Sequence, residues 1–321
     1  MKPNLRSKTM DYFIFNGDTD GICATRQLLF SNQNETKFVT GVKRDIALLD
    51  KIQDLADQEI VVLDVSVEKN HPSLIKLLKQ NCRINWYDHH ISAKIPEHIR
   101  FINHINTDPD INTSQIVNLH LNNKYPDWAI VGLFGDNMTN SADELAQSIF
   151  LSEVDKESIK QMGELFNYNA YGEDLDDLHY HPEEVLKECL KVDHPLDLLS
   201  NSDIIEKLKT GYQSDLSEAS KAKLLQNNTY VFPNQKWGRR VIGVFANLKA
   251  NQNPDQPTAI LIEKEDHFVV SVRSPINKSL NAAQFCAKFP TGGGRKKAGG
   301  INELPKNLLN QFIDELNSFF K

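Results

Sequence analysis

Acidic and histidine side chains follow three short apolar stretches in the N-terminal part of the chain. They occur in the segments FNGDTDG, EIVVLDVSV and RINWYDHHIS, and they are Asp18, Asp20, Asp64, Asp88, His89 and His90. Asp and Gly are ordinary turn formers, so a single acidic turn after a strand says little about function. Three such positions in succession are better explained by one shared site.

The chemistry of such a site follows from charge. Carboxylates and a neutral imidazole that crowd together repel one another unless divalent cations neutralise them. Two ions about 3.5 to 4 Å apart, bridged by a carboxylate, can activate a water molecule and stabilise the attacking and leaving oxygens of a phosphoryl displacement. Mixed oxygen and imidazole ligands suit Mn²⁺ best, with Mg²⁺ or Co²⁺ as substitutes. The pattern therefore predicts a metal centre.

Alternating strands and helices would bring these side chains together. Between Tyr12 and Asp136, β-rich runs alternate with helical patterns. The predicted strands are 12–15, 36–42, 59–65 and 83–87, and the predicted helices are 20–31, 45–57 and 72–80. This alternation favours parallel strands in βαβ units, whose ligand sites form at the carboxyl ends of the strands. The acids and histidines fall at those ends.

The rest of the chain divides into a helical and a mixed region. Residues 141–227 are polar and helical in pattern, and from Thr229 strands return in RRVIGVFA, TAILIE and HFVVSVRS. A glycine-rich turn, TGGGRKKAGG, and an amphipathic helix from Lys306 to Phe320 follow. We predict a two-lobed α/β protein with a parallel-sheet metal-binding domain (1–140), a helical connector (141–227) and a smaller α/β domain (228–321).

Composition limits the classes of protein that fit. The 321 residues, 40% of them hydrophobic, are enough for two cores. No apolar run is long enough to span a membrane and Met1–Thr9 lacks a signal-like core, so we expect a soluble, cytoplasmic protein. The four cysteines are far apart, which favours buried reduced thiols. The net charge of −7 argues against a surface that grips long nucleic acid.

The ordered motifs resemble those of a known superfamily. DTDG, the strand-end Asp64, the DHH tripeptide at 88–90 and Asp136 in WAIVGLFGD are similar to the four successive motifs of the DHH phosphoesterases. GGGRKKAGG resembles the glycine-rich signature of their associated C-terminal domain. The combination covers both lobes and is similar to the RecJ-type exonucleases and the nano-RNase and pAp phosphatase branch.

The resemblance implies a role for each motif residue. Asp18 and Asp64 would hold one ion, and the other would be held by Asp20, Asp64, His89 and Asp136. Asp64 would bridge the ions, His90 would face the substrate phosphate, and Asp88 would orient the two histidines. The family usually has His or Asp where this chain has Asn16. Asn16 therefore either binds the first ion through its carbonyl or shapes the turn.

Other acids and histidines compete for these roles. Asp108 and Asp110, in INTDPDINTS, are alternatives to Asp136, although capping of a helix that starts near Ser114 explains them better. The histidines of LHYHPEE (His179 and His181) and His194 either form a second metal cluster or lie exposed on the connector. Exposure is favoured, because no carboxylate or cysteine pattern organises them.

The candidate substrate-binding residues belong to both lobes. Gly292, Gly293 and Gly294 either form a flexible turn or let the backbone approach an anion, to which Arg295 would add a charged fork. The family more often has His at Arg295. Arg273 and Ser274, in SVRS, resemble the substrate-binding arginine segment of the same domain.

Two basic segments remain open. Lys43 and Arg44, after the second predicted strand, either contact phosphate or lie on a solvated surface. The segment KWGRR (236–240) either stacks a base or protects a strand edge with charge.

The sequence therefore predicts a manganese-dependent, two-metal phosphoesterase that hydrolyses short oligonucleotides or small nucleotides, with His90 and Asp64 as catalytic residues. The alternatives within the enzyme class are a pAp phosphatase, a linear or cyclic dinucleotide phosphodiesterase and a processive RecJ-like single-strand exonuclease. A nucleotide-sensing module with an impaired metal site is the alternative outside it, favoured by Asn16. The oligomeric state is not predicted.

Overall fold

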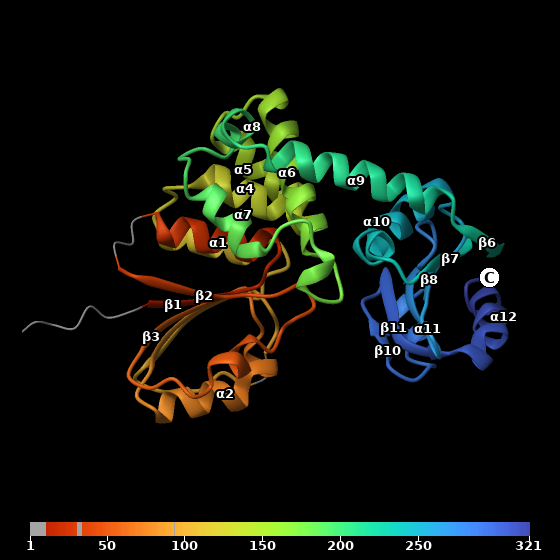
Figure 1. The fold of residues 1–321 in the computed structure, drawn as a ribbon, viewed down its shortest axis with the longest axis horizontal. Helices are drawn as coiled ribbons and strands as arrows, with labels where there is room; N and C mark the ends of the chain where they lie inside the picture. Colours follow the sequence, from red (N-terminus) through yellow and green to blue (C-terminus); the bar gives the residue numbers. More distant parts are fainter. Residues whose placement is uncertain (1–10, 31–33, 93) are drawn as a thin grey trace, which may run out of the picture. The chain divides into compact units, whose positions relative to one another are not determined.

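The computed structural model describes residues 11–30, 34–92 and 94–321 (Figure 1). Met1–Thr9 and the last residue of the predicted helix 20–31 lie outside this range. The chain forms two compact units, Met1–Lys209 and Thr210–Lys321. Each contains its own β-sheet, so the predicted two-lobed α/β architecture is confirmed.

The first unit is built on a parallel five-stranded sheet of order β2-β1-β3-β4-β5. The strands are β1 (Asp11–Phe15), β2 (Thr36–Val39), β3 (Glu59–Leu63), β4 (Arg83–Asp88) and β5 (Phe101–Ile105). The first four occupy the predicted positions. Edge strand β5 was not predicted, because it is half exposed and lacks a continuous apolar pattern.

Helices cover both faces of this sheet. Figure 1 shows α2 (Val67–Lys79) on one face and α1 (Thr19–Leu29) on the other. Leu74, Leu77 and Leu78 of α2 are buried at helical spacing against the sheet. The predicted helix 45–57 is wrong, since only Leu48–Ile52 forms a 3₁₀ turn. The side chain of Asn70 holds this segment on α2 by bonding Leu49 N and Ile46 O.

A layer of further helices packs around α1. It consists of α3 (Thr113–His120), α4 (Pro126–Gly135), α5 (Thr139–Ser148), α6 (Glu153–Ala170), α7 (Pro182–Cys189) and α8 (Leu198–Asn201). Helix α9 (Ile204–Ser220) crosses the boundary between the units. The segment 141–227, predicted as one connector, is therefore divided, and α5 to α8 belong to the first unit.

Arg26 ties α1 to this layer. Its guanidinium is buried and donates hydrogen bonds to the carbonyls of Val192 (2.5 Å) and Asp193 (2.8 Å), beyond α7. Three aromatic rings lie within cation–π distance of it: Phe30 at 4.3 Å, Tyr125 at 5.2 Å and Trp128 at 4.6 Å. A buried cation thus depends on backbone oxygens far along the chain.

The second unit contains a six-stranded sheet of order β10-β11-β9-β8-β7-β6, antiparallel except between β7 and β8. The strands are β6 (Lys223–Gln226), β7 (Thr229–Pro233), β8 (Thr258–Glu263), β9 (His267–Arg273), β10 (Gly292–Gly294) and β11 (Ala298–Pro305). The helices are α10 (Lys236–Gln252), α11 (Ala282–Cys286) and α12 (Leu309–Phe319). The predicted helix at the C-terminus is confirmed.

Helix α10 corrects two predictions. RRVIGVFA (239–246) was predicted as a strand, and its β-branched residues favour one. Its buried residues Val241, Phe245 and Ala246 instead have helical spacing. KWGRR is the first turn of this helix and not a strand edge. Within it, Arg240 forms a buried bidentate ion pair with Asp215, at 2.6 and 2.9 Å.

Two smaller predictions concern the whole chain. All four cysteines are buried and unpaired, as predicted. Among the residues that the structure describes, no helix is both long and apolar enough to span a bilayer.

Candidate metal centre

The turn FNGDTDG connects β1 to α1, and other backbone atoms lie very close to two of its glycines. Asp18 caps α1, since its Oδ1 accepts a hydrogen bond from Gly21 N at 3.1 Å. A Cβ on Gly21 would lie 2.1 Å from Asn16 O, and one on Gly17 would lie 2.0 Å from Gly41 O. Both positions therefore require glycine. The result is a turn that points two buried carboxylates, Asp18 and Asp20, toward the carboxyl edge of the sheet.

The carboxylate of Asp20 is held by the N-terminus of α3. It accepts hydrogen bonds from Thr113 N (2.8 Å) and Ser114 N (2.7 Å). The free amides and positive dipole end of a helix favour an anion at this position. Asp20 is thereby fixed in the centre of the cluster.

The same helix corrects a prediction about two other acids. Asn112, and neither Asp108 nor Asp110, caps α3, because its side chain accepts a hydrogen bond from Gln115 N at 3.1 Å. Asp108 instead accepts a bond from the amide of Asp110 at 2.9 Å, in an exposed turn. Asp136, at the end of α4, is the acid that reaches the other acids.

Asp64 follows β3 in a left-handed conformation, with φ of 58°. This region is costly for residues other than glycine and is tolerated best by Asn and Asp. Thr113 Oγ1 donates a hydrogen bond to Asp64 Oδ1 at 3.2 Å. The strained turn and this bond fix a buried carboxylate at the strand end.

His89 completes the cluster. Its Nε2 lies 3.5 Å from Asp64 Oδ1 and 3.9 Å from Asp136 Oδ2. Possible ligand atoms of Asp64, His89 and His90 lie within 4.8 Å of one another, as do those of Asp20, His89 and Asp136. The two groups share His89, so five residues from four separate segments lie around one imidazole.

His90 is oriented by Asp88. The Nδ1 of His90 lies 2.6 Å from Asp88 Oδ1, which also accepts a hydrogen bond from His89 N at 2.9 Å. Burial alone would lower the pKa of His90, but the hydrogen bond and charge of Asp88 outweigh it and raise that pKa. The ring is therefore held in one orientation, with Nε2 as the nitrogen that remains to face a ligand.

The electrostatics of the cluster call for a cation. Burial, followed by the charges of Asp136 and Asp18, raises the pKa of Asp20 to about 8. Burial and the neighbouring carboxylates also raise the pKa of Asp64 well above its usual range. Burial lowers the pKa of His89, which favours the neutral imidazole that binds metals. A divalent cation fits this donor set of Asp20, Asp64, His89 and Asp136.

The surroundings of Asp18 are different. Lys43 Nζ lies 2.6 Å from Asp18 Oδ2, 3.0 Å from Asn167 Oδ1 and 3.4 Å from Asp136 Oδ1. A second divalent cation does not fit beside Asp18 while this ammonium is there. Asn167 belongs to α6 and was not predicted, because nothing in the sequence connects that helix with the sheet edge.

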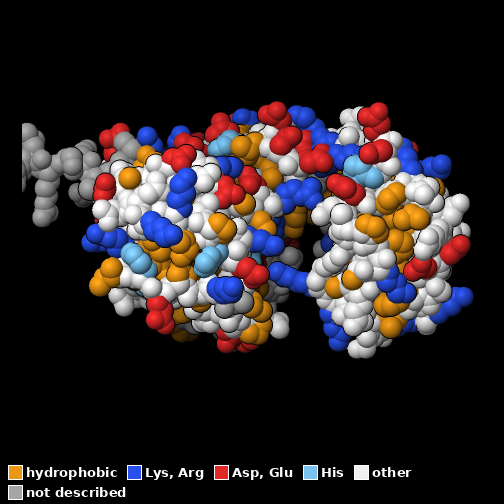
Figure 2. All heavy atoms as spheres, turned by 90° about the horizontal axis from the view of Figure 1, so that it is seen from below, with side chains coloured by type: hydrophobic (Ala, Val, Ile, Leu, Met, Phe, Trp, Pro, Cys, Tyr) orange, Lys and Arg blue, Asp and Glu red, His pale blue; other side chains and the backbone are white. Residues whose placement is uncertain are grey.

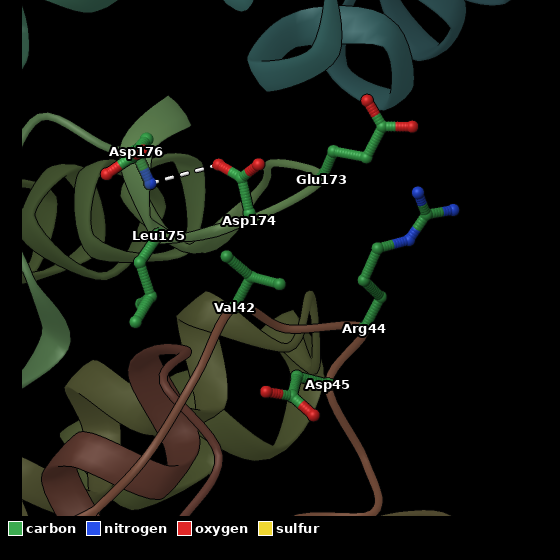
Figure 3. A pocket seen from close by; sticks show the side chains of 7 residues that line it. All are labelled: Val42, Arg44, Asp45, Glu173, Asp174, Leu175 and Asp176. Atoms are coloured by element: carbon green, nitrogen blue, oxygen red, sulfur yellow. Dashed lines mark hydrogen bonds between the residues drawn. The ribbon is translucent and has the colours of Figure 1, made fainter.

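Arg44, the other basic residue predicted here, is exposed. It lines a separate pocket of about 550 Å³ together with Val42, Asp45, Glu173, Asp174, Leu175 and Asp176. Figure 3 shows Arg44 and Glu173 on the same side of this mostly acidic pocket. Lys43 and Arg44 therefore have separate environments although they are adjacent in sequence.

The predicted substrate-binding residues of the second unit lie at one end of its sheet. Arg273 pairs with Ala298 across β9 and β11, and Arg295 N donates to Ala298 O at 2.7 Å. Arg295 is exposed, whereas Ser274 is buried. The guanidinium of Arg273 is bonded to Asn247 Oδ1 at 2.5 Å.

The three glycines of this segment form strand β10 and not a free loop. The amide of Gly292 is already bonded to Phe289 O at 3.1 Å. A Cβ on Gly293 would meet no atom within 4 Å, and Gly294 has φ of 137°. The open side of β10 is therefore at Gly293, beside the exposed Arg295.

The histidines of the predicted connector have other partners. His179 Nε2 lies 2.6 Å from Tyr168 OH, His181 caps α7, and His194 Nε2 lies 3.1 Å from Asp127 Oδ1. In the parts of the chain that the structure describes, neither group of metal-binding side chains includes them.

Solved structures with the same fold are numerous, although no family profile and no curated sequence matches the chain. The exonuclease RecJ bound to manganese is similar over 98% of this chain and 91% of its own, at 15% identity and a TM-score of 0.61. The DHH domain of a member of the s1p family of ribosomal proteins is similar over 97% and 86%, at 14% identity and 0.64. The chain has the same fold as this DHH domain and the RecJ exonuclease.

A third structure with this DHH fold is the pGpG-specific phosphodiesterase PggH from Vibrio cholerae. The similarity covers 97% of this chain and 100% of the phosphodiesterase chain, at 12% identity and a TM-score of 0.56. In the present chain the DHH tripeptide, Asp88 to His90, ends β4 and continues into the cluster described above. The fold and the motif order thus agree.

Proposed function

We propose that this chain is a metal-dependent phosphoesterase that hydrolyses short oligonucleotides or small nucleotides. The observation that carries the proposal is a pair of possible ligand groups at the carboxyl edge of a parallel sheet. Asp64, His89 and His90 form one group, Asp20, His89 and Asp136 form the other, and Asp20 and Asp64 are buried. A structural role alone does not account for these groups, because crowded buried carboxylates are destabilising without a cation.

The metal would be Mn²⁺, with Mg²⁺ or Co²⁺ as substitutes, since the donors are oxygens and one imidazole. The ligands inferred from the motifs are Asp20, Asp64, His89 and Asp136. The motif pattern also implies a second ion beside Asp18, at the oxygen that Lys43 contacts in this structure. A bound ion would supply an activated water molecule and charge stabilisation at phosphorus.

The protein's own residues would orient the substrate. His90 would donate from Nε2 to a phosphate oxygen, because its Nδ1 is held by Asp88. Arg295 and the open edge at Gly293, with Arg273 and Ser274 beside them, would bind the end of the substrate.

Charge favours a short substrate. The net charge of −7 leaves few cations for phosphates distant from the site. On the face drawn in Figure 2, Lys and Arg side chains of the first unit are scattered among acidic and apolar ones. The likeness to a pGpG phosphodiesterase along its whole length is in keeping with a dinucleotide-sized substrate.

A substrate panel in the presence of Mn²⁺ tests the proposal. It would contain dinucleotides, cyclic dinucleotides, pAp, single strands of increasing length and pyrophosphate. We expect the highest kcat/KM for linear substrates of about two to five nucleotides, because further phosphates add little binding energy. Preference for pAp or a cyclic dinucleotide would instead support those two alternatives.

Two outcomes would contradict the proposal. Efficiency that rises with strand length would indicate a processive RecJ-like exonuclease. Nucleotide binding without turnover, with any of the three metals, would favour the sensing module.

A further inference from the structure

The side chain of Lys43 is surrounded by oxygen atoms of the metal centre. The three acceptors around its Nζ are Asp18 Oδ2 at 2.6 Å, Asn167 Oδ1 at 3.0 Å and Asp136 Oδ1 at 3.4 Å. An ammonium group carries three N–H donors, so each donor has one acceptor. The contact to Asp136 also joins this ammonium to the ligand set of the divalent cation.

The backbone of Lys43 is fixed from two sides. Its amide donates to Ala170 O at 2.9 Å, and its carbonyl accepts a hydrogen bond from Asn16 Nδ2 at 3.2 Å. The side-chain oxygen of Asn16, Oδ1, accepts a hydrogen bond from Asp18 N at 3.2 Å. Asn16 therefore connects the acidic turn to Lys43, and both ends of its amide are already in use.

Both carboxylate oxygens of Asp18 already accept a hydrogen bond. Its Oδ1 accepts the bond from Gly21 N and its Oδ2 accepts the bond from Lys43. A divalent cation bound to Asp18 would lie next to an ammonium group, and the two positive charges would repel each other strongly in a buried site. Lys43 and a second ion therefore compete for one carboxylate oxygen.

We propose that this centre holds a single divalent cation and that the ammonium group of Lys43 takes the position of the second. The inference deepens the proposed function, on which it rests for the presence of the first ion. Asn16, where the family usually has a metal ligand, then acts as a positioning residue that holds the Lys43 backbone.

The charges of the centre are consistent with this composition. Asp18, Asp20, Asp64 and Asp136 can carry four negative charges, and one divalent cation with Lys43 supplies three positive ones. Two divalent cations with Lys43 would instead leave the centre positive before substrate binds. Unlike an ion, the lysine cannot dissociate, so Asp18 and Asp136 stay compensated when the metal leaves.

Counting ions in the full chain tests the proposal without reference to activity. The wild type, saturated with Mn²⁺ and freed of excess metal, should contain one Mn²⁺ per chain and give the electron paramagnetic resonance signal of an isolated ion. The double variant Asn16→His, Lys43→Met removes the ammonium and supplies an imidazole. It should bind two ions and give the exchange-coupled signal of an adjacent pair.

Lys51→Met is the matched control. Lys51 forms an equally short ion pair, 2.6 Å from its Nζ to Asp45 Oδ2, outside the centre. This variant should keep one ion. If the double variant does not fold, Asp18→Asn serves instead, and it should also keep one ion because Asp18 binds Lys43 and no metal.

Several results would overturn the proposal. These are two coupled ions in the wild type, one ion in the double variant, or loss of metal in Asp18→Asn. Absence of Mn²⁺ from every variant would overturn this inference together with the metal centre. One ion in the wild type without hydrolysis of any substrate would overturn only the proposed function.

Discussion

Replacing Asp88 by Asn isolates the role of one buried carboxylate. Asp88 is fully buried, and its Oδ1 accepts hydrogen bonds from His90 Nδ1 at 2.6 Å and from His89 N at 2.9 Å. Asparagine keeps the shape and one acceptor but loses the negative charge. The change therefore weakens the orientation of His90 while it leaves the metal ligands in place.

The magnitude follows from the bond that is weakened. A hydrogen bond to a charged group contributes about 1.5–3 kcal/mol, and each 1.4 kcal/mol changes a rate about tenfold. We expect kcat to fall roughly 10- to 100-fold, the range seen when partners of metal-site histidines are replaced. Asp88 also keeps the pKa of His90 raised, so without it the proton is lost at lower pH. The alkaline limb of the pH–rate profile should move to lower pH.

The assay combines kcat across the pH range with Mn²⁺ content. Asp108→Asn is a matched control, because that carboxylate is exposed and accepts only a local backbone bond. An unchanged rate and pH profile in Asp88→Asn would refute the positioning role of Asp88. Loss of Mn²⁺ in this variant would refute the division of roles between His89 and His90.

Three further predictions concern metal, substrate and stability. Asp64→Ala should lose activity together with Mn²⁺, which metal analysis measures. Near-normal turnover would contradict the role of Asp64. Arg295→Ala should raise KM for short substrates about tenfold without loss of Mn²⁺; a KM that stays the same would exclude Arg295 from the site. When a chelator has removed the metal, folded Asp20 keeps its proton up to a pKa of about 8, whereas Asp20 of the unfolded chain loses its proton at about pH 4. The free energy of unfolding should therefore fall as pH rises from about 4 to about 8. Thermal melts at about pH 6 and pH 8 should show a larger loss without Mn²⁺ than with it, and equal losses would disprove this linkage.

The acids of the centre were predictable because their positions follow from regular structure. Asp64 and Asp88 end strands, and parallel strands bring their carboxyl ends to one edge whatever lies between them. Asp20 needs only the turn that starts α1. For these residues, local pattern and tertiary arrangement agree.

Lys43 and Asn167 were beyond such reasoning. Lys43 lies in a loop, and its direction depends on bonds to Ala170 and Asn16, which are distant in sequence. Asn167 reaches the centre only because α6 packs on α4, a contact that no sequence period encodes. The strand predicted within α10 is wrong for a different reason, because its β-branched residues favour a strand while Val241 and Phe245 have helical spacing.

The buried guanidinium of Arg26 limits how far the protein can be shortened from its C-terminus. A fragment that ended at residue 140 would keep Arg26 but lose the carbonyls of Val192 and Asp193, and it would also remove Asn167 from Lys43. A buried charge without its partner costs about 3–5 kcal/mol, a large part of the 5–15 kcal/mol that stabilises a typical domain. The smallest autonomous folding unit that contains the metal centre therefore extends to about residue 209, where the first compact unit ends.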